Sequence, residues 1–318
     1  MNRLVGAQSL AAASALLIVL ALSPCAVLAQ SKVGTAGMQF LEVGTTARVA
    51  GMGEAFVAVA DDASALRYNS AGLAWLEGRE AIFGYTDYPA DITLQYAGAI
   101  APISPVIGTV GIAVTSLTMD DMVVTTPVDS DVTGTGRHFT AGDVAVQLSY
   151  ARMLTDRFSA GLSVRFIQED LEDESAQGIG ADIGTLYDTH WNTVKVGMNI
   201  SNFGPDMKFV EESFPQPLNF TVGVSVEPIS DELHHLILGF EGSHPNDNEE
   251  RAAVGGEYTV YQMLSFRGGY KINYDAETWS AGVGVQVPLG VMGVKVDYSY
   301  TDFGYLSDIH RATLGISL

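Results

Sequence analysis

From about Glu80 to the carboxyl terminus, apolar residues alternate one for one with small or polar residues. The runs 158–166, 220–227 and 294–301 show the alternation clearly. Successive side chains of a β-strand point to opposite faces, so this period of two predicts strands with one apolar and one polar face. The predicted strands are residues 80–88, 91–101, 107–118, 139–152, 157–168, 178–188, 193–202, 217–228, 233–243, 250–259, 263–274, 277–288, 291–302 and 308–318. About fourteen antiparallel strands predict an all-β fold, a transmembrane β-barrel.

The connections between these strands alternate in length and character. The short ones lie at 154–156, 228–232 and 288–290, and the long or acidic ones at 119–138, 169–177, 203–216 and 244–249. Bacterial outer-membrane barrels have short periplasmic turns and longer outer loops. We therefore expect both chain termini on the periplasmic side and the long connections outside.

Aromatic residues gather near the ends of the predicted strands. Amphipathic rings favour the boundary between membrane and water, although aromatics also have an ordinary preference for strands. The expected aromatic girdles comprise Tyr85, Tyr88, Tyr187, Trp191, Tyr258, Tyr261, Tyr270, Tyr274, Trp279, Tyr298 and Tyr300. The last strand reaches the carboxyl terminus and ends in Leu318, where outer-membrane proteins usually end in an aromatic residue.

The first 29 residues have the layout of a secretory signal peptide. Arg3 gives a basic start, Leu10 to Leu22 form an apolar stretch, and the small residues before Gln30 predict cleavage after Ala29. A membrane anchor and an acylated Cys25 are the alternatives. Cys25 is the only cysteine, so the expected mature chain contains no thiol. We expect export to the outer membrane of a Gram-negative-type bacterium.

The formal net charge of −21 argues against nucleic acid as a partner, because an acidic surface repels phosphate. The acidic runs near 169–174 and 247–250 lack the spacing of a calcium loop. His234 and His235 are neighbours on a predicted strand and point to opposite faces, so they cannot easily chelate one ion. The sequence has no Gly-x-Ser-x-Gly elbow, no phosphate-binding glycine loop and no His-Glu-x-x-His motif. A hydrolase embedded in the barrel is the alternative, since its Ser, His and acid would converge in space without a recognisable spacing. We expect no enzyme activity, no catalytic residue, no cofactor and no metal.

Residues 30–78 have no period of two and are rich in small residues. A barrel of about fourteen strands is too wide for its own side chains to fill, so a compact segment ahead of it predicts a luminal plug. The expected organisation is signal peptide 1–29, plug 30–78 and barrel 79–318. Charged residues on the strands should face inward, because a charge facing lipid is costly. We expect Asp61 and Asp62 to pair with luminal bases from the last strands, or to cap local structure.

The run Arg48, Gly51-Met52-Gly53, 55–59, 61–64 and 69–73 resembles the N-terminal signature of the PorV/PorQ family, barrels related to the FadL transporters. This chain has Ser70 where the family usually has proline. The resemblance implies a FadL-like barrel with an N-terminal luminal segment. The plug and lumen candidates are Arg48, Gly51, Gly53, Asp61, Asp62, Asn69, Ala71, Arg165, Arg267, Lys271, Lys295 and Arg311.

The same resemblance implies two alternative roles. The first is a component of type IX-like protein secretion or of the cell envelope, with secretion-system proteins as partners. The second is a channel for long-chain fatty acids or other hydrophobic compounds. Outer-membrane lipid surrounds the barrel in both cases. The motif itself does not separate the two roles.

Overall fold

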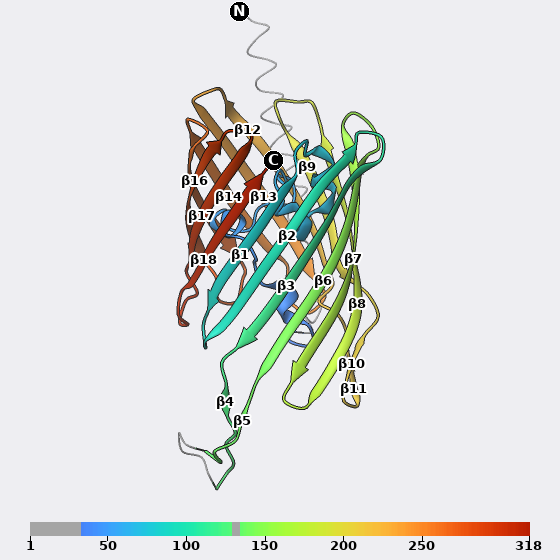
Figure 1. Cartoon of the computed structure of the whole chain (residues 1–318), viewed down its shortest axis with the longest axis vertical. Coiled ribbons are helices and arrows are strands. Elements are labelled where there is room, and N and C mark those ends of the chain that lie inside the picture. The colour runs from blue at the N-terminus through green and yellow to red at the C-terminus, as the bar shows by residue number, and fades with distance from the viewer. Residues whose placement is uncertain (1–32, 129–133) are drawn as a thin grey trace, which may run out of the picture. The chain divides into compact units, whose positions relative to one another are not determined.

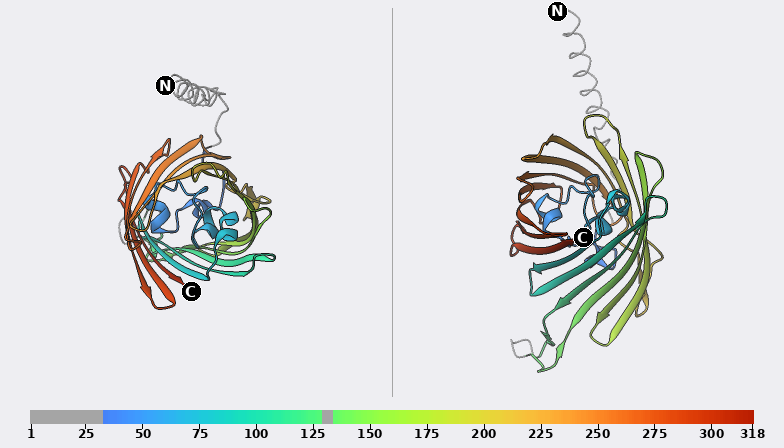
Figure 2. Two further views of the ribbon diagram at one scale, coloured as in Figure 1. Left: turned by 90° about the horizontal axis from the view of Figure 1, so that it is seen from above. Right: turned by 45° about the horizontal axis from the view of Figure 1, so that its top comes forward.

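The computed structural model describes residues 33–128 and 134–318. The predicted signal peptide therefore lies outside the described residues. Fourteen antiparallel strands form a closed barrel in the order β1-β18-β17-β16-β15-β14-β13-β12-β9-β8-β7-β6-β3-β2, as Figures 1 and 2 show. This confirms the fold class predicted from the alternating pattern.

All fourteen wall strands overlap the predicted ones. They are β1 (Glu80–Tyr88), β2 (Ile92–Ser104), β3 (Gly108–Met119), β6 (Ala141–Met153), β7 (Phe158–Leu171), β8 (Glu174–Asp188), β9 (Lys195–Phe203), β12 (Asn219–Ser230), β13 (His234–Pro245), β14 (Arg251–Val260), β15 (Leu264–Ile272), β16 (Trp279–Leu289), β17 (Met292–Thr301) and β18 (Ile309–Ser317). The ring closes where β1 pairs with β18, from Glu80↔Ser317 to Asp87↔His310.

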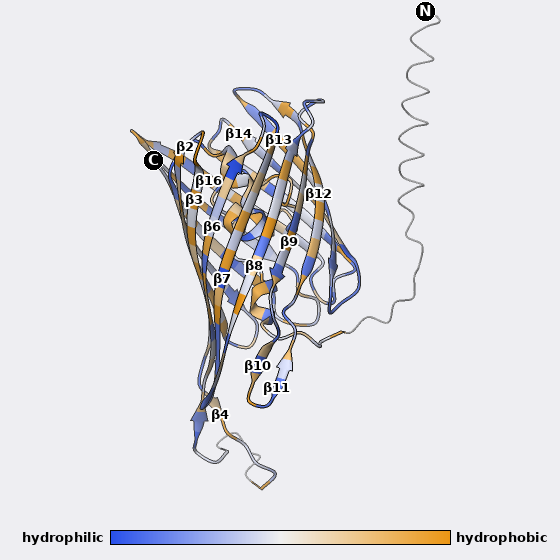
Figure 3. Ribbon diagram, turned by 90° about the vertical axis from the view of Figure 1, so that its right-hand side faces the viewer, coloured by the Kyte–Doolittle hydropathy of each residue, from blue (hydrophilic) through white to orange (hydrophobic). Residues whose placement is uncertain are grey.

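The strands place apolar side chains outside and small or polar ones inside. On β7, Leu162, Val164 and Phe166 are exposed, whereas Ser163 and Arg165 are buried. The coloured ribbon shows apolar and polar residues alternating along the strands (Figure 3). Exposed apolar residues that surround a whole sheet indicate a surface that contacts lipid rather than water.

The two ends of the barrel differ in their connections. The end that carries the short turns 105–107, 154–157, 231–233, 261–263 and 290–291 also holds the strand ends nearest both termini, and we call it the inner end. The other, outer end carries the longer connections, including 120–140, 204–218 and 302–308. The short and long connections therefore lie at opposite ends of the barrel, as the sequence predicted.

Three details of the outer end differ from the sequence predictions. The predicted connection 169–177 shrinks to Glu172 and Asp173, because β7 and β8 continue to pair up to Leu171↔Glu174. Two small hairpins were not predicted, since their strands are only two or three residues long. They are β4 (Met122–Val123) with β5 (His138–Phe139), and β10 (Met207–Phe209) with β11 (Glu212–Phe214).

Most of the predicted girdle aromatics lie on the outside of the wall. Trp191, Tyr261 and Trp279, for example, are exposed. The prediction was wrong for Tyr88 and Tyr274, which line a cavity inside the outer end. Tyr88 shares the inward face of β1 with Ile82, Gly84 and Thr86, so the alternation itself places it in the lumen. Tyr274 lies beyond the end of β15, after Asn273 at φ 62°, where the alternation no longer fixes the side-chain direction.

The residues before β1 fold inside the barrel, as the end-on view shows (Figure 2). We call the described residues 33–78 the luminal segment. Its short elements are η1 (Gln39–Glu42), α2 (Ala47–Gly51), α3 (Ala65–Tyr68) and η2 (Ser70–Trp75). None of the helices in the described residues is both long and apolar enough to cross a membrane.

The luminal segment has an apolar core that it shares with the wall. Val49, Met52 and Phe56 are fully buried and belong to one cluster with Leu66 and Leu73. Wall residues complete this cluster, namely Ile82, Tyr96, Ile100, Ala113, Ala151 and Ile237. Burying these side chains is the main driving force that holds the segment inside.

Candidate functional site

The candidate site is the lumen, where the luminal segment meets the wall. Seven inward-facing glycines form what we call the glycine band, and a Cβ added at any of them would lie 1.9–2.5 Å from an atom of the luminal segment. The band consists of Gly161, Gly184, Gly197, Gly223, Gly239, Gly255 and Gly269. Its members pair directly across neighbouring strands, for example Gly239↔Gly255 and Gly255↔Gly269. The segment therefore lies against the wall backbone over half the circumference.

Two candidate glycines of the luminal segment contribute to this close approach. Gly51 lies beside Gly282 of β16, and a Cβ on Gly51 would come within 3.2 Å of its Cα atom. Gly53 has a φ of 63°, a left-handed conformation that glycine adopts without strain. Its backbone amide donates to Ser280 Oγ at 3.1 Å. Glycine at both positions lets the chain turn in direct contact with the wall.

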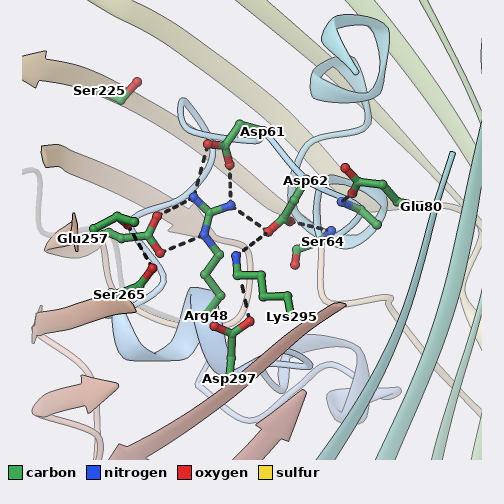
Figure 4. A network of polar contacts seen from close by, with 12 residues as sticks. Arg48, Asp61, Asp62, Ser64, Glu80, Ser225, Glu257, Ser265, Lys295 and Asp297 are labelled. Carbon is green, nitrogen blue, oxygen red and sulfur yellow. Dashed lines mark hydrogen bonds and ion pairs between the residues drawn. The ribbon is translucent and has the colours of Figure 1, made fainter. Parts of the chain in front are cut away.

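Arg48 of α2 is the centre of a charged cluster near the inner end (Figure 4). Its guanidinium donates to Asp61 Oδ1 at 2.5 Å, to Asp62 Oδ2 at 2.6 Å and to Glu257 Oε1 at 2.7 Å. Asp61 and Asp62 belong to the luminal segment, whereas Glu257 belongs to β14. Arg48 therefore joins two distant parts of the segment to the wall.

The wall extends this cluster through three strands. Arg267 of β15 contacts Glu257 through its Nε atom and lies 2.8 Å from Asp297 Oδ1 of β17. Lys295 Nζ lies 3.7 Å from Asp62 Oδ2 and 3.9 Å from Asp297 Oδ2. We call these seven residues the inner cluster: Arg48, Asp61, Asp62, Glu257, Arg267, Lys295 and Asp297.

Mutual attraction sets the charge states within the inner cluster. Burial lowers the pKa of Arg48, but the surrounding carboxylates Asp61, Glu257 and Asp62 outweigh burial and raise the pKa well above its usual value. Burial likewise raises the pKa of Asp62, but Arg48 and Lys295 outweigh it and hold this pKa at about 2. Both groups are therefore charged at neutral pH.

We predicted that Asp61 and Asp62 pair with bases on the strands, and the two residues differ in this respect. Asp62 lies near Lys295 of β17 and also accepts a hydrogen bond from the Ser64 amide at 2.8 Å. Asp61 contacts Arg48 of the luminal segment instead of a strand base. Its side chain remains 37% exposed, because it faces the cavity at the inner end. The expectation of a strand partner for Asp61 was therefore wrong.

A second charged group, the outer cluster, surrounds Lys271 of β15. Its ammonium donates to Glu54 Oε2 of the luminal segment at 2.9 Å and also contacts Glu277 in the β15–β16 connection. Burial raises the pKa of Glu277, but Lys271 and Arg311 outweigh burial and lower it. Arg311 Nε donates to the Gly44 carbonyl at 3.2 Å. The outer cluster thus links the segment to a loop as well as to strands.

The remaining candidates hold the segment by hydrogen bonds. The Asn69 side chain donates to the Val57 carbonyl at 2.7 Å and accepts from the Ala71 amide at 3.1 Å. Arg165 of β7 lies 2.5 Å from Asp182 and also donates to Gln147, whose amide nitrogen donates in turn to the Leu66 carbonyl at 2.5 Å. Arg165 therefore acts on the segment through another side chain.

Several wall residues that bind the segment were not among the predicted site residues, including Glu257 and Ser280 described above and also Glu241 and Gln147. Glu241 of β13 accepts hydrogen bonds from the backbone amides of Phe56 at 3.0 Å and Val57 at 2.8 Å. Gln147 of β6 binds the segment as described above. The alternating pattern places both residues inward, but it carries no signal for a backbone partner more than eighty residues away.

Two cavities flank the packed middle of the lumen. The inner cavity, about 720 Å³, is lined by the inner cluster and by inner-end turns such as 261–263. The outer cavity, about 620 Å³, is lined by residues 37–40 and 42–44 of the segment and by outer-end residues. Among the described residues, the two linings have no member in common. No group of three potential metal ligands occurs in that part of the chain either.

Solved structures similar to this chain include fourteen-strand barrels, two of which are named as toluene transporters. The Ralstonia pickettii toluene transporter TbuX superposes with a TM-score of 0.63 at 14% identity, covering 86% of this chain and 98% of that one. A Pseudomonas aeruginosa FadL homologue gives 0.57 at 12% identity, with the same coverage. The Pseudomonas putida toluene transporter TodX gives 0.53 at 10%, covering 80% and 92%. At these identities, the likeness establishes the fold alone.

Comparison with curated proteins gives no match. The sequence model described as "Type IX secretion system protein PorV" matches residues 27–244. This range includes the whole described luminal segment and the wall from β1 into β13. It also contains the resemblance at residues 48–73. On this match, the chain belongs to the PorV family.

Proposed function

We propose that this protein is a non-enzymatic, protein-binding barrel of the outer membrane that serves protein secretion of the type IX kind. The family match over residues 27–244 carries the proposal, because it includes the luminal segment as well as most of the wall. A match confined to alternating strands would support only a barrel.

The packing of the lumen favours a role in binding over a role as an open pore. The glycine band brings the luminal segment against the wall backbone, and the inner cluster ties Arg48 to the wall through Glu257. The charged groups of the inner cluster are occupied with one another. Such groups are suited to holding a segment in place.

The same proposal covers the organisation and location of the chain. Residues 1–29 would be removed as a signal peptide, residues 30–78 would plug the lumen, and residues 79–318 would cross the outer membrane. The inner end would face the periplasm and the outer end the exterior. The partner proteins would then meet one of these two rims.

Uptake of hydrophobic compounds is the second candidate, and the outer cavity favours it. Met38, Phe40, Val43 and Leu117 give this cavity an apolar surface near the exterior. The structural neighbours TbuX and TodX are named as toluene transporters. The family match makes this the weaker of the two candidates.

A pull-down from outer membranes tests the proposal. The barrel, tagged within an outer loop, is isolated from gently solubilised membranes, with the untagged strain as control, and co-purifying proteins and lipids are identified by mass spectrometry. Recovery of secretion-system proteins supports the proposal. A bound hydrocarbon or fatty acid without a protein partner supports the second candidate. Fractionation with soluble proteins would refute both.

A further inference from the structure

The outer cavity combines apolar, aromatic and acidic surfaces in one hollow of about 620 Å³. Six carboxylates and one guanidinium line it. They are Glu42, Glu54, Asp143, Glu169, Asp275, Glu277 and Arg251. The cavity is therefore rich in negative charge, although most of its remaining lining is uncharged.

Four of the six carboxylates have a base of this chain close by. Glu54 and Glu277 contact Lys271. Arg251 lies 3.4 Å from Glu42 and 3.7 Å from Asp275. Each of these four carboxylates therefore has a cationic neighbour, which distinguishes them from the other two.

Asp143 of β6 and Glu169 of β7 form the exception. They are direct cross-strand neighbours, and both line the cavity. Within the described part of the chain, neither has a salt-bridge partner within 4.0 Å. Two like charges placed opposite each other on a sheet destabilise it, unless a proton or another cation is shared between them.

Apolar groups stand beside this carboxylate pair, and aromatic rings line another part of the same cavity. Leu117 is the cross-strand neighbour of Asp143 and packs against the buried cluster that contains Met38 and Phe40. Across the cavity mouth, the rings of Tyr88 and Phe303 pack edge to face with their centroids 5.3 Å apart. A bare metal ion would gain nothing from these surfaces, and no third ligand accompanies the pair among the described residues.

We infer that the outer cavity binds an organic cation, in which an ammonium group sits between Asp143 and Glu169 and an attached apolar body packs on Leu117 and its neighbours Met38 and Phe40. Carboxylates supply charge-assisted hydrogen bonds to the ammonium, and aromatic faces attract cations as well as apolar groups. Such a cation is either a free amine or a lysine side chain next to an apolar residue. This site does not depend on the proposed secretion role.

Calorimetric titration of the purified full-length barrel in an uncharged detergent tests the inference with matched small molecules. The probe is 2-phenylethylammonium, and its controls are the neutral 2-phenylethanol and the anionic 3-phenylpropionate. The ammonium should bind on the order of tenfold more tightly than the alcohol, and the anion should not bind. Equal binding of the ammonium and the alcohol would overturn the inference and leave a plain apolar pocket.

Isosteric variants locate the site. Asp143→Asn combined with Glu169→Gln should weaken ammonium binding by roughly tenfold or more, while the alcohol is unaffected. Asp170→Asn is the matched control, since Asp170 is the next residue on β7, is exposed and does not line the cavity. Heat-modified migration on gels verifies that each barrel is folded. An equal loss with Asp170→Asn would overturn the inference, because the effect would be one of general charge.

Two further probes identify the cation. Acetyl-Phe-Lys-amide distinguishes the sources: tighter binding than the free amine indicates a protein-borne lysine, and weaker binding indicates a free amine. Calcium is titrated separately. Binding of calcium that disappears in the double variant, without binding of the ammonium, would overturn the inference in favour of a metal site.

Discussion

In the inner half of the lumen, all four carboxylates of the inner cluster lie within 4.0 Å of a base, and the central base belongs to the luminal segment. In the outer half, Lys271 is a strand residue that joins the segment to a loop, and two carboxylates of the cavity have no base. Every carboxylate of the inner cluster thus has a base, whereas in the described part of the chain the outer cavity keeps one carboxylate pair without a base. Both halves hold the luminal segment, but among the described residues only the outer cavity contains such a pair.

The chemistry of the central bases agrees with this division. A guanidinium presents several donors in a rigid plane and can bind three carboxylates at once, as Arg48 does. An ammonium is a point charge on a flexible stem, so Lys271 fixes the geometry of its partners less strictly. We therefore expect the inner cluster to be more costly to disrupt than the outer one.

Arg48→Met should have the largest effect. It leaves Asp61, Asp62 and Glu257 without their shared partner, and removal of one member of a buried ion pair costs about 3–5 kcal/mol. Urea unfolding of the purified barrel measures this loss. Arg137→Met is the control, because Arg137 and Glu172 form an exposed pair that should contribute less than about 1 kcal/mol. Similar losses in both variants would contradict the central role of Arg48.

Gly269→Ala should have the second-largest effect and lower the free energy of unfolding by about 2–3 kcal/mol. The packed middle of the lumen, which both halves share, cannot accept another atom. The new Cβ would lie 2.1 Å from the Gly53 backbone nitrogen. Gly268→Ala is a matched control one residue away, where nothing lies within 4 Å, and it should leave unfolding unchanged. If both variants unfold alike, the segment is not pressed against the wall at this glycine.

Acid should weaken the inner half by about 2 kcal/mol through Asp62 alone. The pKa of an aspartate in an unfolded chain is about 3.9, and the folded pKa of Asp62 is about 2. Because the folded value is lower, this stabilisation is complete above about pH 4 and is lost as the pH falls toward 2. The free energy of unfolding, measured across this pH range, should depend less steeply on pH in Asp62→Asn than in the unchanged barrel. An equally steep dependence would argue against assigning this stabilisation to Asp62.

Lys271→Met should lower the free energy of unfolding by about 1–2 kcal/mol, which is less than the loss in Arg48→Met. Glu277 lies in a connection between strands, so it can turn toward water when Lys271 is removed. The same urea titration allows the two variants to be compared directly. A cost equal to that of Arg48→Met would remove the distinction between the inner and outer clusters.

Ser70→Pro should have the smallest effect, a stabilisation of about 0.4–1 kcal/mol. Ser70 is the first residue of η2, a position that proline favours, and Asn69 before it is extended at φ −162° and ψ 96°. Ala71→Pro is the opposing control, because the Ala71 amide donates to Asn69 Oδ1 and would be lost. A destabilised Ser70→Pro barrel would show that the serine is required there.

The wall was predictable from sequence because strand alternation is a local property. All fourteen strands, the inward direction of Arg165 and Arg267 and the side on which the long connections lie follow from the period of two. The path of the luminal segment has no such period. Its decisive contact, Arg48 with Glu257, spans 209 positions, and no local rule connects these two residues. Tyr274, beyond the end of β15, shows the limit of the alternation at strand ends.

The seam of the barrel has a consequence for how the molecule is made. Arg79, just after the luminal segment, exchanges backbone hydrogen bonds with Leu318, the last residue of the chain, at 3.1 and 2.8 Å. The cylinder can therefore close only after β18 and Leu318 have been synthesised. Until then the lumen has an open side, through which the segment can still enter. Loss of Leu318 and the last residues of β18 would remove the hydrogen bonds that close the wall at Arg79, where the luminal segment joins β1.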